Sequence, residues 1–298
     1  MKFQLDTNFV YDPQRQGFGT NLWKLITGSA PTVVSNKLRV TAATILHYSD
    51  IFRGYFNFVL NVPDTPTNAL LTGGTGATAV AATYAAVTDG EFTISLEGTA
   101  YDITAIDFTG VTTMAGVAAK IQAAIIAQTG LSFITVVWST NKFIITSRIS
   151  ISVLSAVSGG SGTDISGAGA TAFMDSDTGN GTVTAATNSN KKFGLIQLSK
   201  NLRCYFHLRG AVLVCVTSND NGDVKETEIT WVTAWTAHDI KYEIDATRRE
   251  VKFKINENQV AYHETYCPEG VMSLYIENLL ADNFDLSYIE ARDIETNI

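Results

Sequence analysis

The chain has 298 residues, of which 45% are hydrophobic, 17% are charged and 10% are aromatic. A chain of this length can bury two ordinary domain cores, and its aromatic and β-branched residues favour strands. The formal net charge of −8 argues against a nucleic-acid partner, because a negative surface repels phosphate backbones.

The N-terminal segment, MKFQLDTNFV, does not have the pattern of a signal peptide, because Asp6 and Asn8 interrupt its apolar residues. No run of 18 apolar residues follows, so we predict no membrane insertion. We therefore expect synthesis in a cytoplasm and release by lysis.

The composition changes twice along the chain. Residues 63–190 hold only three of the 21 basic residues, namely Lys120, Lys142 and Arg148, and none of the cysteines. Segments rich in Gly, Thr and Ser form both ends of this block, and such segments tolerate insertions. The predicted organisation is a discontinuous outer domain at 1–63 plus 190–298, an inserted domain at 85–185, and linkers at 64–84 and 175–190.

The outer domain contains many short segments in which apolar and polar residues alternate. In 238–245, for example, Ile240, Tyr242 and Ile244 share one face, as in a half-buried strand. With polar turns between the segments, the pattern predicts an antiparallel sandwich. The predicted strands are 37–42, 55–62, 193–200, 202–208, 211–218, 228–235, 238–245, 250–256, 270–278 and 284–292.

The insert predicts a small α+β domain in the order ββαββ. Residues 92–103 have a hairpin pattern, and 133–139 with 143–148 have a second one. Between them, apolar residues recur at helical spacing from Met114. Thr112 or Thr113 can cap the start of this helix, and Gly130 follows its end.

The insert resembles a small domain of tailed-bacteriophage structural proteins, notably certain tail-sheath proteins. The resemblance rests on GEFTISLEGTAYDITAIDFTGVTTMAGVAAKIQAAI (90–125), FITVVWSTNKFIITS (133–147) and SGGSGTDISGAGATAF (158–173). It implies a structural role in a virion.

The outer domain resembles concanavalin A-like (laminin G-like) jelly rolls. The segment HDIKYEIDATRREVKFKINENQVAYHE (238–264) has the matching succession of strands and turns, and 284–292 matches the closing strand. The predicted fold class is therefore mainly β, a jelly-roll β-sandwich interrupted by an α+β insert.

Some concanavalin A-like folds are glycosidases with two glutamates flanking an aspartate on one strand. This chain offers Glu243-Ile244-Asp245, but the next acid, Glu250, lies beyond a turn. We therefore expect Glu250 not to share the face of Glu243. Glu243 and Asp245 are expected to face solvent or a neighbouring subunit, and no catalytic residues are predicted.

The remaining chemistry-bearing residues give no metal or nucleophile motif. The four histidines (His47, His207, His238, His263) lack the spacing of a zinc site. Cys204 and Cys215 could face each other across a hairpin, and with Cys267 they are expected to be reduced. The loop 219–223 resembles part of a calcium loop, but a polar turn is the simpler interpretation. The glycine-rich stretch 159–169 is predicted to be a flexible exposed loop.

Trp231 and Trp235 are the tentative glycan-binding residues. If 228–235 is a strand, their rings share one face and could stack on a sugar, although core packing is the simpler expectation.

Together these patterns predict a structural protein of a tailed-phage virion, placed either on the capsid surface or in the tail or baseplate. Its expected partners are other virion proteins and further copies of itself, with no cofactor and no metal. We predict that it is not an enzyme. Two alternatives stay open, a lectin-like module that binds host-surface glycan and a tail polysaccharide depolymerase.

Overall fold

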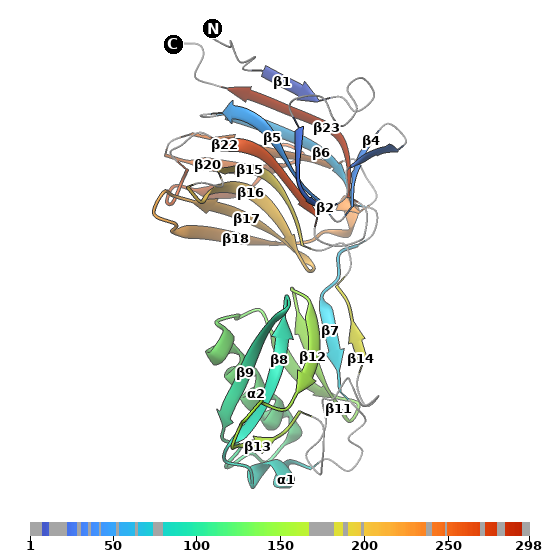
Figure 1. The fold of residues 1–298 in the computed structure, drawn as a ribbon, viewed down its shortest axis with the longest axis vertical. Helices are drawn as coiled ribbons and strands as arrows, with labels where there is room; N and C mark the ends of the chain where they lie inside the picture. Colours follow the sequence, from blue (N-terminus) through green and yellow to red (C-terminus); the bar gives the residue numbers. More distant parts are fainter. Residues whose placement is uncertain are drawn as a thin grey trace. The chain divides into compact units, whose positions relative to one another are not determined.

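The chain folds into two compact units in a computed structural model (Figure 1). Unit 1 comprises Met1–Pro66 and Thr187–Ile298, and unit 2 comprises Thr67–Ala186. The structure describes residues 8–11, 23–28, 31–34, 37–41, 43–51, 54–62, 65–73, 80–166, 182–186, 190–197, 200–236, 240–247, 249–268, 272–278 and 284–293.

Unit 1 is a sandwich of two antiparallel sheets. The eight-stranded sheet has the order β21-β20-β19-β6-β23-β4-β3, with β1 also pairing with β23. Its strands are β1 (Asn8–Tyr11), β3 (Thr32–Val34), β4 (Lys37–Val40), β6 (Gly54–Asn61), β19 (Ile240–Ala246), β20 (Val251–Ile255), β21 (Asn258–His263) and β23 (Phe284–Asp293).

The seven-stranded sheet has the order β18-β17-β16-β15-β22-β5-β2. Its strands are β2 (Trp23–Gly28), β5 (Ala43–Ile51), β15 (Lys191–Gln197), β16 (Leu202–Arg209), β17 (Val212–Ser218), β18 (Val224–Thr230) and β22 (Met272–Asn278).

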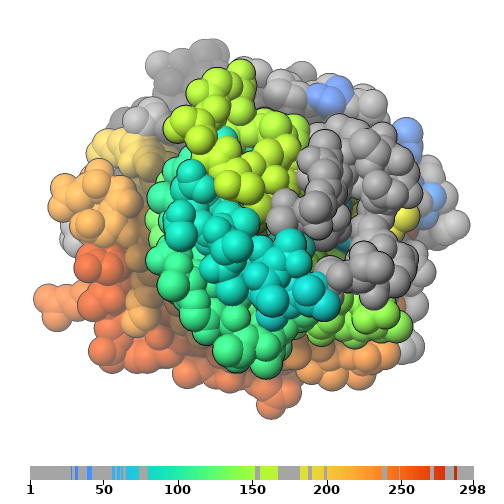
Figure 2. Space-filling view, turned by 90° about the horizontal axis from the view of Figure 1, so that it is seen from below, coloured from blue at the N-terminus to red at the C-terminus, as the bar shows by residue number. Residues whose placement is uncertain are grey.

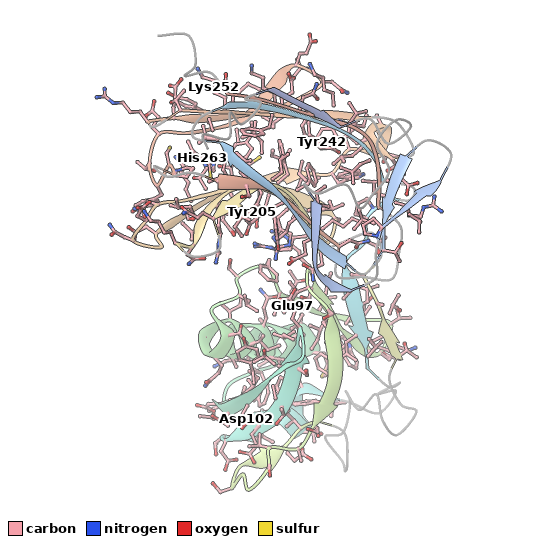
Figure 3. The ribbon with its side chains drawn as sticks, turned by 45° about the horizontal axis from the view of Figure 1, so that its top comes forward. Glu97, Asp102, Tyr205, Tyr242, Lys252 and His263 are labelled. Carbon is pink, nitrogen blue, oxygen red and sulfur yellow. The ribbon has the colours of Figure 1, made fainter. Side chains whose placement is uncertain are left out.

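The core of unit 1 lies between these sheets. Successive side chains of a strand point to opposite faces, so every second residue enters the core. Tyr242 of β19 is buried there, as the alternation predicts (Figure 3). Phe206, from the other sheet, meets Tyr242 and Phe253 edge to face, with ring centroids 5.4 and 5.1 Å apart. These aromatic contacts hold the sheets together.

The two parts of the chain on either side of the insert form one sheet. The C-terminal strand β23 lies between β6 and β4 of the N-terminal part. Arg39 of β4 makes a two-pronged ion pair with Asp285 of β23, both nitrogen–oxygen distances being 2.8 Å. Unit 1 therefore needs both parts of the chain.

Unit 2 is a small α+β domain with two four-stranded sheets. One sheet has the order β10-β11-β7-β14, and the other has β12-β8-β13 with β9 on β8. The elements are β7 (Ala69–Thr72), α1 (Ala81–Ala85), β8 (Gly90–Leu96), β9 (Thr99–Ile106), α2 (Met114–Thr129), β10 (Thr135–Ser139), β11 (Lys142–Ser147), β12 (Ile151–Ser155), β13 (Thr163–Asp164) and β14 (Thr182–Thr184).

Helix α2 has the two ends that the sequence predicts. The Thr113 hydroxyl accepts a hydrogen bond from the Gly116 amide at 3.1 Å, and Gly130 closes the helix with a φ of 72°. The buried face of the helix, which includes Ile121 and Ile125, packs in a core separate from that of unit 1. Unit 2 thus has its own hydrophobic core.

The two segments predicted to be linkers are part of the structure of unit 2, so that prediction is wrong. Segment 64–84 contains β7 and most of α1, and segment 175–190 contains β14. Strands β7 and β14 pair with each other, Leu71 opposite Val183. The insert therefore begins and ends on neighbouring strands.

The predicted fold class, a jelly-roll β-sandwich interrupted by a small α+β insert, is confirmed. The ββαββ order appears as β8-β9-α2-β10-β11, and further strands extend it on both sides. The segment predicted as a strand over 228–235 does not continue past Thr230. The Trp231 amide bonds to the Ala211 carbonyl, and a 3₁₀ turn, η1 (Thr233–Trp235), follows.

Candidate functional sites

Trp231 and Trp235 do not lie on one strand, because the turn η1 follows directly after β18. Their rings meet edge to face, with centroids 5.4 Å apart and an interplanar angle of 89°. Trp231 is buried in the core of unit 1, and its indole nitrogen donates to the Thr236 hydroxyl at 3.1 Å. Trp235 packs against that core and is half-buried. The two rings therefore do not share one strand face, as the glycan-stacking hypothesis assumed, and Trp231 packs in the core, as the simpler expectation had it.

The acids of the glycosidase-like motif, Glu243, Asp245 and Glu250, lie on the outer face of the eight-stranded sheet. Two of them form ion pairs with lysines. Lys241 contacts Glu243 at 2.9 Å, and Lys252 donates to Glu250 at 2.7 Å. Asp245 lies opposite Lys252 in the register of β19 and β20.

Two expectations about these acids are wrong. Glu250 accepts a hydrogen bond from the Tyr262 hydroxyl at 2.6 Å. Tyr262 lies opposite Lys252, and Lys252 lies opposite Asp245, so all three side chains are on the outer face. The Glu250 carboxylate therefore lies on the same face as Asp245. Glu243 is only 4% exposed, which places it among neighbouring side chains rather than in open solvent.

His263 is a buried link between the two sheets. It lies on β21 of the eight-stranded sheet, and its Nδ1 and Nε2 are 2.8 and 2.9 Å from the hydroxyls of Thr217 and Thr227 in the seven-stranded sheet. The pKa of His263 is lowered from 6.5 to about 4, mainly by burial and secondly by the positive charge of Lys225. A neutral ring that bonds both hydroxyls is a structural element. The His47 side chain and His238 lie outside the described residues.

The outer face of the seven-stranded sheet carries charged and aromatic side chains that the sequence patterns did not single out. Glu277 accepts hydrogen bonds from Lys192, at 2.5 Å, and from the Tyr275 hydroxyl. Arg209 donates to both oxygens of the Glu226 carboxylate at 2.9 and 3.2 Å. The alternation within 202–209 is the signal that could have located this face.

His207 lies on the same outer face and is held neutral. Its Nδ1 is 3.4 Å from Arg209, which can only donate, so Nε2 carries the proton and donates to Asn190 Oδ1 at 3.3 Å. Burial, followed by the charges of Arg209 and Lys192, lowers the pKa of His207 well below 6.5.

The three cysteines are free thiols in the core of unit 1. Cys204 lies opposite Thr217, and Cys215 lies opposite Phe206, so the two thiols are diagonal rather than directly opposed. Burial raises the pKa of both well above 9.

The loop 219–223 is a polar turn held by hydrogen bonds among its own side chains and backbone amides. Asn219 Oδ1 accepts hydrogen bonds from the amides of Asn221 and Asp223, and Asn219 Nδ2 donates to the Asp223 carboxylate at 2.9 Å. Across the described parts of the chain, no group of three or more His, Cys, Asp and Glu side chains has a metal-binding arrangement.

Unit 2 contains a cavity of about 390 Å³ that sequence reasoning missed. We call it the acidic cavity, because two carboxylates, those of Asp89 and Glu91, line it. Its lining residues are Asp89, Glu91, Thr104, Ala105, Val157, Ser158, Gly159, Gly160, Ser161 and Gly162.

The glycine-rich loop that lines the acidic cavity is partly ordered against β8, which corrects the expectation of a flexible exposed loop. Strand β13 runs parallel to the start of β8, and the Thr163 amide and hydroxyl bond to Asp89 at 2.9 and 3.0 Å. Figure 2 shows the lime surface of this part of the chain directly beside the teal surface around β8. The last three residues of 159–169 lie outside the described residues.

Residues 66–188 match the family model described as the insert domain of the tail sheath protein gp31 of phage E217. This range corresponds closely to unit 2. The match supports a phage structural role. None of the curated proteins compared matches the chain.

Solved structures similar to the chain include several enzymes. A β-glucanase of Bacillus licheniformis is 8% identical to this chain, with a TM-score of 0.41. The alignment covers 97% of this chain and 100% of the glucanase chain. The apo Crh5 transglycosylase is 12% identical with a TM-score of 0.41, covering 98% and 86%. A family 16 endo-glucanase of Bacteroides ovatus is 8% identical with a TM-score of 0.38, covering 95% and 99%.

The prediction that the chain is not an enzyme is contradicted by these neighbours, whose names are those of glycoside hydrolases and a transglycosylase. The exclusion of an enzyme is therefore withdrawn. At identities of 8–12% and TM-scores of 0.38–0.41, the likeness assigns no activity to this chain. Among the residues described, no helix has both the length and the apolar character needed to cross a membrane.

Proposed function

We propose that the chain is a structural protein of a tailed-phage virion and that it is a component of the tail. The observation that carries this proposal is the match of residues 66–188 to the insert domain of a tail sheath protein. In such a protein the jelly roll could dock on the particle while the insert is presented to other partners.

The construction of the insert supports a role as a module. Unit 2 has its own core, and β7 and β14, which begin and end it, are paired strands. A host can carry such a unit without rearranging its own sheets, because the two chain ends lie side by side. The insert has few basic residues, which suits docking by shape and hydrogen bonding rather than by positive charge.

The partners under this proposal are other virion proteins and further copies of the chain, arranged with the symmetry of the particle. Capsid decoration is the other location. The match to a tail sheath insert favours the tail.

Labelling of intact particles tests the location. An antibody against unit 2 should mark the tails of particles of the phage whose genome encodes the chain. Label on the capsid alone would move the protein to the decoration role, and absence of the protein from washed particles would overturn the proposal.

Glycan binding remains a second candidate, because the half-buried Trp235 lies beside Val232, which is 47% exposed. A glycan array would show whether the chain binds sugar, and Trp235→Ala should then abolish the signal. If no glycan binds, or if the variant binds as the parent does, this assignment of Trp235 is wrong. A reducing-sugar release assay on the same glycans tests the depolymerase alternative.

A further inference from the structure

The acidic cavity of unit 2 is lined by Glu91, a largely buried residue whose carboxylate has no partner among the described residues. Glu91 is only 7% exposed, and within the described residues its carboxylate makes no hydrogen bond or ion pair. A carboxylate of a largely buried residue is stabilised when a ligand or ion pairs with it.

The geometry of the glycine loop shows where this carboxylate points. A Cβ atom added at Gly160 would lie 2.0 Å from Glu91 Oε1, and one added at Gly162 would lie 2.8 Å from Glu91 Oε2. The two glycines thus let the loop lie against the carboxylate, and both line the same cavity.

The electrostatics of the cavity select a cation. Among the described lining residues, Asp89 and Glu91 are the charged ones, and none is Lys, Arg or His. Asp89 holds its position through the Thr163 hydroxyl, 3.0 Å from Oδ1, which leaves the remaining carboxylate oxygens for a ligand.

The donor atoms select the kind of cation. The polar groups that line the cavity are carboxylates, the hydroxyls of Thr104, Ser158 and Ser161, and backbone atoms of the loop. No thiol or imidazole is present among these lining residues, so the side-chain donors are all oxygens, as hard cations prefer. Calcium accepts flexible arrangements of carboxylates, carbonyls and waters, and a cavity of about 390 Å³ has room for several waters.

We propose that the acidic cavity is a binding site for a divalent cation, calcium, held by the carboxylates of Glu91 and Asp89 with oxygens of the loop 157–162 and waters. The ion would neutralise the carboxylate pair and fix the loop against β8. This site lies within unit 2 and does not depend on the proposed place of the chain in a virion.

The site is tested by equilibrium dialysis of the full chain against radioactive calcium chloride at constant ionic strength. We expect saturable binding of one ion per chain with a Kd of about 10⁻⁴ to 10⁻³ M, as in sites with few carboxylates. Absence of saturable binding at concentrations about tenfold above this range would overturn the proposal.

Two matched substitutions locate the ion. Glu91→Gln keeps the size of the side chain and removes its charge, so calcium affinity should fall about tenfold or more. Glu97→Gln makes the same change on the exposed turn between β8 and β9, outside the cavity, and should leave affinity unchanged. Equal affinity of the Glu91→Gln variant and the parent would refute the site.

A third variant separates geometry from charge. Gly160→Ala adds a methyl group that must displace the Glu91 carboxylate while the charge remains. We expect weaker calcium binding in a chain whose far-ultraviolet circular dichroism matches that of the parent. A folded Gly160→Ala variant that binds calcium as tightly as the parent would show that the loop does not form the site.

Discussion

The imidazole of His263 and the hydroxyl of Thr217 lie 2.8 Å apart and join the two sheets of unit 1. His263 lies in the layer between the sheets, against the ring of Phe253 at a centroid distance of 5.3 Å (Figure 3). Because Thr227 contacts the other ring nitrogen, the neutral imidazole donates one hydrogen bond and accepts one. A second proton on the ring would break this arrangement.

This arrangement predicts a loss of stability in acid. The pKa of His263 is about 4 in the folded chain, against an ordinary value of 6.5. Above pH 6.5 the imidazole is neutral in both the folded and the unfolded chain, and its contribution to the free energy of unfolding is complete. As the pH falls towards 4, the unfolded chain binds a proton on this ring before the folded chain does, so the contribution is lost. The expected loss in the free energy of unfolding is roughly 3 kcal/mol.

Urea unfolding of the parent and of His263→Gln at pH 7 and pH 4 checks this prediction. The variant should be less stable at pH 7 and should lose less stability on acidification. His207→Gln is the necessary companion, since the pKa of His207 is also lowered and contributes in the same direction. An unchanged pH dependence in His263→Gln would contradict the assignment.

The ion pair between Arg39 and Asp285 predicts a second effect on unit 1. It joins β4 to β23, and the Asp285 side chain is 11% exposed. Asp285→Asn should lower the free energy of unfolding by about 1–3 kcal/mol, the value of hydrogen bonds to charged groups. Asp220→Asn, which affects an exposed pair with Lys200 at 3.6 Å, should cost less than about 0.5 kcal/mol. Denaturant melts of both variants test the difference, and equal losses would contradict it.

Two glycines with positive φ, Gly194 and Gly98, differ in the space around them. An added Cβ at Gly194 would lie 2.5 Å from the Cys204 carbonyl oxygen and from Tyr205 Cα, whereas Gly98, at a φ of 79°, has nothing within 4 Å of such an atom. Gly194→Ala should therefore destabilise unit 1 by about 3 kcal/mol or more, and Gly98→Ala should cost unit 2 about 1 kcal/mol. Thermal melts rank the two variants, and the reverse order would show that crowding at Gly194 is relieved by movement of β16.

The cap of α2 offers a test confined to unit 2. Thr113→Ala removes the hydroxyl that accepts from Gly116 and should cost about 1 kcal/mol. Thr112→Ala changes the neighbouring exposed threonine, which is not the cap residue, and should be neutral. Comparable destabilisation by both substitutions, measured by the melting of helical circular dichroism, would place the cap elsewhere.

Local patterns predicted the elements whose determinants lie within a few residues. The helix start at Thr113 and its end at Gly130 follow from capping chemistry. The core positions of β19 follow from the alternation of Ile240, Tyr242 and Ile244.

The features that depend on distant partners were not predictable. Strand β7 has an unremarkable sequence, and it is a strand because β11 and β14 pair with it. Glu91 acquires its place in a cavity from a loop about seventy residues further along the chain. Trp231 and Trp235 do not share a strand face, because the 3₁₀ turn Thr233–Trp235 follows directly after β18. Each of these depends on a pairing that composition and periodicity do not encode.

The placement of the chain in the tail is tested most directly by a cryo-electron microscopy map of intact particles of the phage that encodes it. The proposal predicts density for the jelly roll and for the insert domain of residues 67–186, repeated with the symmetry of the tail. Density that accounts for the whole tail without either unit, together with no peptides of the chain in the purified particles, would contradict it.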